Sequence, residues 1–398
     1  MIANFVNLPN EKVNCRFMYL LNMLKRTNNE IELVTSNFKH GTKNKRKYEE
    51  NELKGLRYKI TLIDEPGYKK NISLKRFYSH YKLGKNLGKY LDSMKAKPDV
   101  IYCAIPSLDV GKVCAKYCKK HNIRFIIDIQ DLWPEAFKMV FNIPIISSIL
   151  FYPIKKKADY IYSNADNIVA VSETYCNRAL KVNKKTNKGL SVFLGTDLKY
   201  FDKCEKENKI EFNDNLIRIA YIGTLGHSYD IPLIIDAIKI LNNNGIDNIK
   251  FIIIGDGPLK ENFENYAKDK KINCEFTGRL EYEKMVGLLC SCDIAVNPIK
   301  KGSAGSIINK VGDYAAAGLP VVNTQESVEY RNLLDTYEAG INCISGNAEE
   351  ISQKLESLFV NKKLIENIGI NSRKLAEEKF DRNKTYARIL SILLGGEE

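Results

Sequence analysis

Residues 302–324 read GSAGSIINKVGDYAAAGLPVVNT. A loop of glycines and serines leads into a helical pattern, and Gly318 separates that pattern from a short apolar strand. Such a loop lets backbone N–H groups approach an anion at the positive end of a helix. Ser306, Lys310 and Asp313 lie four and three residues apart, so we expect them to share one helix face. A diphosphate would then meet Ser306 and Lys310, with Asp313 placed to accept hydrogen bonds from ribose hydroxyls. The alternative is an ordinary surface helix that ends at Gly318.

Compact apolar runs alternate with helical patterns along the rest of the chain. Runs that are buried on both faces and separated by helices indicate parallel sheets with right-handed crossovers. The runs are Ile31–Ser36, Asp99–Ala104, Arg124–Ile129, Asn167–Ser172, Leu190–Leu194, Ile217–Gly223, Lys250–Gly257, Cys274–Gly278, Asp293–Pro298 and Pro320–Thr324. The sequence therefore predicts an α/β protein with two Rossmann-like doubly wound parallel-sheet domains. We expect them to face each other across a cleft, because ligands bind at the carboxyl ends of such strands.

The length of 398 residues and the hydrophobic fraction of 44% suit two domains. We expect an N-terminal domain over 1–198, a linker over 199–215 and a C-terminal domain over 216–380. Residues 381–398 are predicted to form a helix, for which packing back on the N-terminal domain is one arrangement. The 10 cysteines include no Cys-x-x-Cys pair, and no apolar signal segment precedes them. This pattern favours reduced thiols in a cytoplasmic protein.

The charge is unevenly distributed between the two halves. Residues 1–200 hold 36 Lys+Arg against 18 Asp+Glu, a net charge of +18, whereas residues 201–398 hold 25 against 30, a net charge of −5. A basic half attracts nucleic acid, anionic lipid or a phosphorylated substrate, although a bias in composition is the simpler explanation. The longest apolar stretch, Ile143–Ile154, is shorter than the ~20 residues of a membrane-spanning helix.

Several motifs occur in a characteristic order and spacing. They are ADNIVAVSE (Ala165–Glu173), VFLGTDLKYF (Val192–Phe201), AYIGTLG (Ala220–Gly226), IIIGDGP (Ile252–Pro258), FTGRLEYEKM (Phe276–Met285) and SIINKVGDYAAAGLPVV (Ser306–Val322). Through these motifs nearly the whole chain resembles the retaining glycosyltransferases of family 4, which have the glycosyltransferase B fold. DIQDLWPEAF (Asp128–Phe137) and LVTSNFKHGTKNKR (Leu33–Arg46) resemble the branch that builds bacterial capsules and other surface polysaccharides.

The resemblance implies roles for residues on the donor side. It places the donor ribose on Asp313, the diphosphate on Lys310 and the nucleobase beside the loop of Gly278 and Arg279. Gly223, in the loop after the first strand of the second domain, is expected to line the same site.

The chain departs from the family pattern at several positions. Gly305 stands where a first glutamate is common, and Thr224 and Tyr229 stand where an arginine and a lysine are usual. Lys310 would therefore carry more of the interaction with the diphosphate. His227 is a candidate to compensate, with a structural role as the alternative, and we place Thr224 and His227 in the donor site.

The N-terminal domain is expected to bind the acceptor. The usual Gly-Gly loop is absent there, and Arg16 or Lys12 is expected to serve in its place. Asp131 is our candidate for contacting the attacking hydroxyl or the donor sugar. Gln130 and Glu135 are expected beside it, and Trp133 would either stack on a sugar ring or pack beneath the loop. The chain contains no Asp-x-Asp pair, so we expect no metal and no other cofactor.

The resemblance thus implies a hexosyltransferase-type enzyme that moves a sugar, with retention of configuration, from a nucleotide-sugar such as a UDP-sugar to a saccharide acceptor. We expect the acceptor to be linked to polyprenyl diphosphate. Two segments indicate peripheral attachment to an anionic cytoplasmic membrane face: the basic and aromatic stretch Tyr68–Tyr90, and Ile143–Ile154 followed by Lys155, Lys156 and Lys157. The alternative is that Ile143–Ile154 is buried core and the lysines only solvate one face. The alternatives are a nucleotide-sugar 2-epimerase of the same architecture and a catalytically degenerate partner subunit. Binding of nucleic acid is not expected, because no recognition motif accompanies the lysines.

Overall fold

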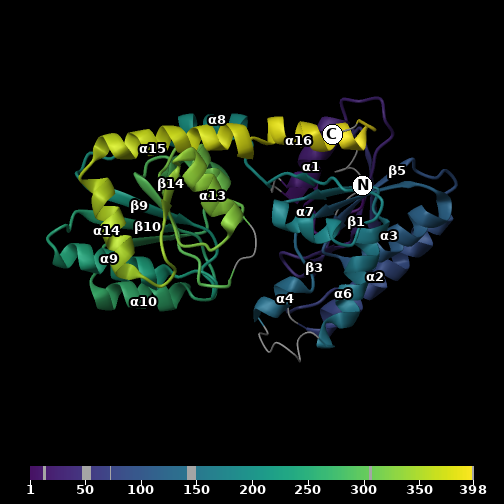
Figure 1. Cartoon of the computed structure of the whole chain (residues 1–398), viewed down its shortest axis with the longest axis horizontal. Coiled ribbons are helices and arrows are strands. Elements are labelled where there is room, and N and C mark those ends of the chain that lie inside the picture. Colours follow the sequence, from purple (N-terminus) through teal and green to yellow (C-terminus); the bar gives the residue numbers. More distant parts are fainter. Residues whose placement is uncertain (12–14, 47–54, 72, 141–148, 304–306, 397–398) are drawn as a thin grey trace. The chain divides into compact units, whose positions relative to one another are not determined.

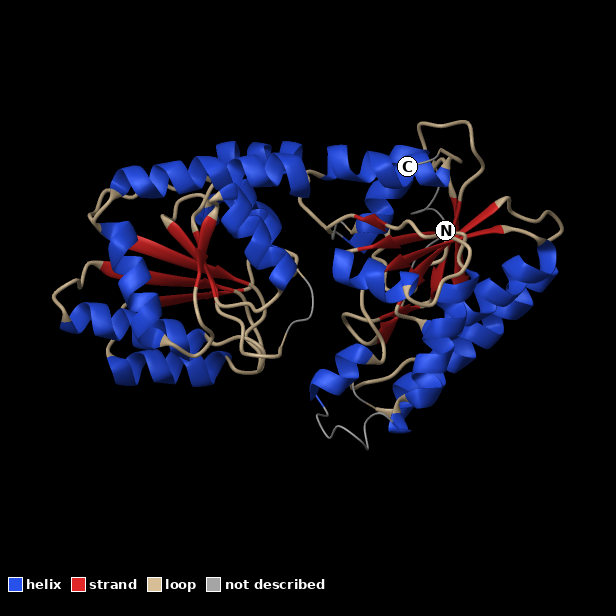
Figure 2. Cartoon of the chain, in the orientation of Figure 1, coloured by secondary structure: helices blue, strands red, loops and turns tan. Residues whose placement is uncertain are grey.

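The computed structural model describes residues 1–11, 15–46, 55–71, 73–140, 149–303 and 307–396. The chain forms two compact units. The first comprises Met1–Val192 together with Tyr386–Glu398, and the second comprises Phe193–Thr385. In each unit a β-sheet is flanked by helices (Figures 1 and 2). The predicted α/β fold with two parallel-sheet domains is confirmed.

The second unit is built on six parallel strands in the order β11-β10-β9-β12-β13-β14. The first strand of the unit, β9, lies in the middle, and the chain adds strands first on one side of it and then on the other. This is the Rossmann order, and it brings the carboxyl ends of the central strands together. The strands are β9 (Ile217–Ile222), β10 (Ile249–Ile254), β11 (Cys274–Gly278), β12 (Ile294–Asn297), β13 (Val321–Asn323) and β14 (Gly340–Asn342).

Helices cover both faces of this sheet because successive residues of each strand point to opposite sides. Ile219 and Tyr221 of β9 belong to the hydrophobic cluster that contains residues of α9, α10 and α14. Ala220 and Ile222 belong to the opposite cluster, with residues of α8, α11, α12, α13 and α15. These helices are α8 (Leu198–Asn208), α9 (Ile231–Asn243), α10 (Lys260–Lys270), α11 (Tyr282–Leu289), α12 (Lys310–Ala316), α13 (Val328–Tyr337), α14 (Ala348–Phe359) and α15 (Lys362–Leu375). A π-helical turn (Ala376–Phe380) then leads to α16 (Arg382–Leu393).

The segment 199–215, expected as a linker, differs from that expectation. Its first half forms α8, whose Phe201 and Cys204 are buried in the core of the second unit. The polar residues around them are the solvent-facing side of this amphipathic helix. The chain passes between the units at Val192 and Phe193 instead.

The first unit contains a four-stranded parallel sheet and a parallel pair joined by the start of the chain. The order β5-β6-β7-β8 and the pair β1-β4 are both bridged by Ile2, which pairs with Val34 and Cys103. The residues around Ile2 therefore act as the central strand of a second Rossmann-like sheet. The strands are β1 (Glu32–Ser36), β4 (Lys59–Ile63), β5 (Val100–Ile105), β6 (Arg124–Ile129), β7 (Asn167–Ala170) and β8 (Leu190–Ser191), with a small antiparallel pair β2 (Phe38–Lys39) and β3 (Asn44–Lys45).

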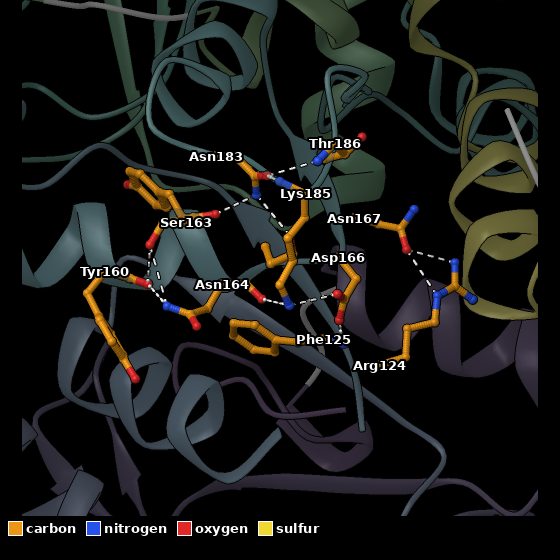
Figure 3. Close-up of polar contacts among 12 residues, drawn as sticks. Arg124, Phe125, Tyr160, Ser163, Asn164, Asp166, Asn167, Asn183, Lys185 and Thr186 are labelled. Carbon is orange, nitrogen blue, oxygen red and sulfur yellow. Dashed lines mark hydrogen bonds and ion pairs between the residues drawn. The ribbon is translucent and has the colours of Figure 1, made fainter. Parts of the chain in front are cut away.

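The helices of the first unit are α1 (Arg16–Leu24), α2 (Leu74–Ser93), α3 (Leu108–His121), α4 (Glu135–Val140), α6 (Tyr152–Asn164) and α7 (Glu173–Leu180). Polar side chains connect the start of β6, the end of α6 and the start of β7 (Figure 3). Asp166 accepts hydrogen bonds from the backbone N–H of Phe125 at 2.7 Å and from Nζ of Lys185 at 2.8 Å. Oδ1 of Asn167 accepts two hydrogen bonds from the guanidinium of Arg124. This network orders the edge of the sheet opposite to the carboxyl ends of the strands.

Within the described residues, no helix has the length and apolarity needed to cross a membrane.

Candidate functional site

The ammonium group of Lys310 lies between two aromatic rings in the second unit. Its Nζ is 3.8 Å from the ring centre of Tyr221 and 4.2 Å from that of Tyr229. The atom is enclosed and has no hydrogen-bond partner among the described residues. Burial lowers the pKa of Lys310 well below its ordinary value, while the two rings favour the charged form through cation–π attraction. A cation held in this way is ready for an anionic ligand.

The end of β9 positions this lysine. Gly223 follows the strand with φ of +134°, and a Cβ there would lie 3.4 Å from Oη of Tyr221 and 3.5 Å from Nζ of Lys310. Tyr314, on the same helix as Lys310, accepts a hydrogen bond from the backbone N–H of Ile222 at 2.9 Å and donates one to the carbonyl of Val296 at 3.1 Å. Helix α12 is therefore fixed to the ends of two central strands.

Glycines allow the loops after β9, β10 and β11 to come close together. A Cβ on Gly255 would lie 1.8 Å from the carbonyl oxygen of Gly223, so no larger residue fits there. Gly255 forms a bridge with Gly278, which ends β11 with φ of +71°. Arg279, the residue after Gly278, is exposed. The structure thus brings the predicted Gly223, Gly278 and Lys310 to one edge of the sheet.

Two other predicted donor residues follow β9 in the same loop. The side chains of Thr224 and His227 are exposed, and the carbonyl of Thr224 accepts a hydrogen bond from the Tyr221 hydroxyl at 2.7 Å. Tyr229, which stands where a lysine is usual, supplies one of the two rings around Lys310.

Asp313 lies one turn beyond Lys310 in α12. Its Oδ1 accepts hydrogen bonds from the hydroxyl of Thr196 at 2.8 Å and from that of Tyr282 at 3.1 Å. Burial raises the pKa of Asp313 and outweighs these two bonds, which lower it. No described residue donates a hydrogen bond to Oδ2 of Asp313, so this oxygen is the one placed to accept from a ligand hydroxyl. Thr196 and Tyr282 were not predicted as site residues.

The predicted helix start is in a different place. Helix α12 begins at Lys310 and has seven residues, so Lys310 and Asp313 both belong to it. Ser306 itself lies outside the described residues, as do Gly305 and Lys12.

In the first unit, the residues predicted on the acceptor side follow the carboxyl end of β6. Oδ2 of Asp131 accepts a hydrogen bond from Nε1 of Trp133 at 3.1 Å, and burial raises the pKa of this carboxyl group. Trp133 is 5% exposed and packs beneath the loop, which was the alternative to stacking on a sugar. Gln130 donates to Asp128 at 3.4 Å, and Glu135 accepts from Arg178 at 2.5 Å.

Arg16, which was predicted on the acceptor side, lies in a buried ion-pair network. It is 2% exposed, and its guanidinium forms an ion pair of 2.8 Å with Asp128, whose side chain is fully buried. It also donates to the carbonyl of Val192 and, at 3.4 Å, to the hydroxyl of Tyr386. Burial opposes the charge of Arg16, but Asp128 together with the hydroxyl groups of Tyr386 and Tyr102 outweighs burial, and the pKa of Arg16 is raised. The hydroxyl of Tyr102 completes the network by donating to Asp128 at 2.7 Å.

The part of the chain that matches a known protein family includes both β9 and α12. Residues 202–375 match the family "Glycosyl transferases group 1". The chain resembles glycosyltransferases of the B fold. Over 240 residues it is 25% identical to an uncharacterized glycosyltransferase of Methanocaldococcus jannaschii, MJ1069, and the match covers 59% of this chain and 60% of the relative. It is 23% identical over 308 residues to the capsular polysaccharide biosynthesis glycosyltransferase CapM of Staphylococcus aureus, and the match covers 75% of this chain and 77% of the relative.

A shorter match concerns an enzyme with a lipid-linked substrate in its name. Over 122 residues the chain is 30% identical to an α-1,4-N-acetyl-D-galactosaminyltransferase of Campylobacter jejuni that is named for a diphosphate-undecaprenol-linked saccharide, covering 26% of this chain and 34% of the relative.

Solved structures show the same fold. Anabaena HepE in complex with UDP superposes with a TM-score of 0.69 at 13% identity, covering 99% of this chain and 98% of that one. WaaG, a glycosyltransferase involved in lipopolysaccharide biosynthesis, superposes with a TM-score of 0.65 at 12% identity, covering 99% of both. At these identities the likeness concerns the fold, and it identifies the architecture as the glycosyltransferase B fold.

Proposed function

We propose that the protein is a retaining glycosyltransferase that moves a sugar from a nucleotide-sugar, with a UDP-sugar as first choice, to a saccharide acceptor. The observation that carries this proposal is the enclosed ammonium of Lys310, which has no hydrogen-bond partner among the described residues and lies beside the glycines at the end of β9. A donor diphosphate would supply the negative charge that the described residues around Lys310 do not. The ribose hydroxyls would then reach Oδ2 of Asp313.

The chemistry requires stabilisation of the charge that grows on the departing diphosphate. Lys310 supplies a positive charge for this purpose in a site of low dielectric, where its interaction with an anion is strong. In the proposed reaction the acceptor hydroxyl attacks from the same face as the leaving diphosphate, which accepts the hydroxyl proton. Asp131, in the first unit, is the proposed contact of the acceptor hydroxyl.

We propose that the acceptor is linked to polyprenyl diphosphate and that the product serves bacterial surface polysaccharide synthesis. Two relatives support this proposal by their names, one for a capsule and one for an undecaprenol-linked saccharide.

A donor screen tests the proposed function. UDP-, GDP- and dTDP-sugars are incubated with the protein, and both hydrolysis and the shift in melting temperature are measured. We expect one UDP-sugar to stabilise the fold and to be slowly hydrolysed. Conversion of UDP-N-acetylglucosamine to its 2-epimer without an acceptor would indicate an epimerase instead, and no response to any of these donors would contradict the proposal.

Divalent metal is expected to be dispensable. The proposed site supplies the ammonium of Lys310 where metal-dependent enzymes place a cation between carboxylates and the diphosphate. Transfer or donor hydrolysis should therefore continue at an unchanged rate in excess EDTA. Loss of activity that Mg²⁺ or Mn²⁺ restores would refute this prediction.

Attachment to an anionic membrane is proposed for the first unit. Helix α2 exposes Leu74 at 87%, Tyr78 at 54% and Tyr81 at 55%, and Ile149 and Leu150 are exposed at 73% and 65%. Such neighbouring apolar groups suit insertion at an interface, and nearby lysines would contribute about 1 kcal/mol each next to anionic lipid.

Two details of the structure refine this proposal. The ring centre of Phe137 lies 6.1 Å from that of Phe77 in α2 and 5.9 Å from that of Phe151, so Phe137 connects the apolar groups of α2 with those beside Leu150. Lys155 and Lys157 form ion pairs with Asp159 and Asp109, which leaves fewer free lysines than the sequence indicates. Residues 143–148 of the predicted apolar segment lie outside the described residues.

Liposome flotation tests the attachment. We expect binding to vesicles with anionic lipid at low salt and release at high salt, since salt screens exposed charges. The double variant Phe77→Ser/Tyr81→Ser should bind the vesicles several-fold more weakly. The control Ile370→Ser also replaces an exposed apolar side chain by serine, but in the second unit, where the residue is 68% exposed, and it should bind as the wild type does. Failure of the wild-type protein to float with anionic vesicles at low salt would contradict the prediction.

A further inference from the structure

A group of aromatic rings surrounds Arg76 in the first unit. The guanidinium carbon of Arg76 lies 4.7 Å from the ring centre of Trp133, 5.6 Å from that of Tyr68 and 5.8 Å from that of Phe5. One turn further along α2, the ring of His80 stacks on that of Trp133, with 5.8 Å between the ring centres and an angle of 3° between the ring planes. Cation–π contacts of this kind hold a planar guanidinium in a fixed orientation.

A second cation approaches one of these rings. Nζ of Lys43 lies 5.0 Å from the ring centre of Tyr68 and 3.2 Å from Nδ1 of His40. Two like charges close together repel each other unless an anion lies between them. In the part of the chain that the structure describes, no carboxylate forms an ion pair with Arg76 or Lys43. The buried carboxylate of Glu65 is already hydrogen-bonded to two serine hydroxyls.

Two polar atoms around Arg76 and His80 lack hydrogen-bond partners among the described residues. Nε of Arg76 and Nε2 of His80 are enclosed and form no hydrogen bond with described residues. Burial, followed by the charges of Lys43 and Arg76, lowers the pKa of His40 to about 4. Burial and then Arg76 lower the pKa of His80 to about 3. Both imidazoles are therefore neutral at pH 7, and the positive charge of the cluster resides on Arg76 and Lys43.

We propose that Arg76 and Lys43 form an anion subsite that binds the diphosphate of the acceptor. This inference rests on the proposed function and names the chemical group by which the acceptor is recognised. A guanidinium offers several N–H groups in one plane, which match the oxygens of a phosphate, and an ammonium adds a second charge.

The subsite lies where a ligand of this fold is expected. Lys43 belongs to the turn between β2 and β3, and Trp133 follows the carboxyl end of β6. Because Trp133 also donates a hydrogen bond to Asp131, the subsite adjoins the residue proposed to contact the acceptor hydroxyl.

Trp133 provides a direct test, because it is the only tryptophan of the chain and it contacts Arg76. The full-length protein is titrated with inorganic pyrophosphate while its tryptophan emission is recorded. We expect a saturable change in emission. Arg76→Met should raise the dissociation constant at least about tenfold and Lys43→Met about threefold, because each removes a charge-assisted contact. Arg76→Lys should give an intermediate value.

Two control variants locate the response. Arg57→Met removes an exposed arginine of the same unit, and Lys310→Met removes the cation of the proposed donor site. Both should leave the dissociation constant measured at Trp133 unchanged. Because Arg76 contacts the indole, its replacement can change the emission intensity without any ligand. The variants are therefore compared by their dissociation constants and not by the size of the emission change. The proposal is overturned if pyrophosphate leaves the wild-type emission unchanged, or if Arg76→Met binds with wild-type affinity.

Further titrations identify the source of the anion. A short-chain prenyl diphosphate should bind at least as tightly as pyrophosphate, whereas a response to phosphatidylglycerol vesicles without one to pyrophosphate would assign the cluster to lipid headgroups and overturn the proposal. None of these measurements uses sugar transfer. If the donor screen fails but the emission response persists, the proposed function is wrong while the diphosphate subsite stands.

Discussion

Replacement of Lys310 by methionine is expected to lower the turnover number roughly 100- to 1000-fold, because it deletes a charge that acts on the departing diphosphate. The side chain keeps its length between Tyr221 and Tyr229, so the packing of the site should survive. Since the ammonium is enclosed without a hydrogen-bond partner among the described residues, its removal should preserve or raise the melting temperature. A loss of activity could then not be attributed to unfolding.

The contrast with two other variants sharpens this prediction. Asp313→Ala should chiefly raise the dissociation constant for UDP, because a ribose contact is made in both the ground state and the transition state. Lys301→Met, an exposed lysine in the preceding loop, should leave both quantities unchanged. Steady-state kinetics and calorimetric titration with UDP would separate the three cases, and a wild-type rate for Lys310→Met would show that the site is assigned wrongly.

The largest effect on stability is expected for Arg16→Met. The ion pair of Arg16 and Asp128 is almost fully buried, with side-chain exposures of 1% and 0%. Removal of one partner from a buried pair costs about 3–5 kcal/mol, because the other charge remains without compensation. Urea unfolding followed by circular dichroism should show an early transition of the first unit.

A second substitution identifies the cause. Asp128→Leu added to Arg16→Met removes the isolated charge, and it should recover at least half of the lost stability. Arg57→Met, at an exposed arginine of the same unit, should have an effect within about 0.5 kcal/mol. If the double variant is as unstable as the sum of its single changes, the buried charge is not the source of the loss.

Most of the fold could be predicted because its strands are long apolar runs between helical patterns. The bridge at Ile2 was not predicted, since a strand of so few residues has no detectable periodicity. The sequence also pointed to a linker where α8 lies, because a helix with only three buried residues appears polar throughout. Short or strongly polar elements depend on tertiary contacts that no local pattern encodes.

The candidate site was only partly predictable for a related reason. The spacing of Lys310 and Asp313 in one helix was sufficient to single them out. Their partners come from distant parts of the chain: Tyr221 from an apolar strand, and Thr196 from a segment 117 residues before Asp313. The buried ion pair of Arg16 was not predicted, although the sequence held a signal for it. RFMYLLNML is otherwise an apolar helix, in which a lone arginine needs a buried partner.

The divided first unit has a consequence for synthesis on the ribosome. Its last segment begins at Tyr386, whose ring packs with Arg16 and Tyr19 in the same core as Ile389 and Ile392. A nascent chain that has emerged only to Val192 lacks these side chains, and it exposes the apolar surface that they later cover. The second unit is continuous, so it can be completed first although it is translated later. The half that is made first is thus the half that finishes folding last, and in the interval it is a natural client for chaperones.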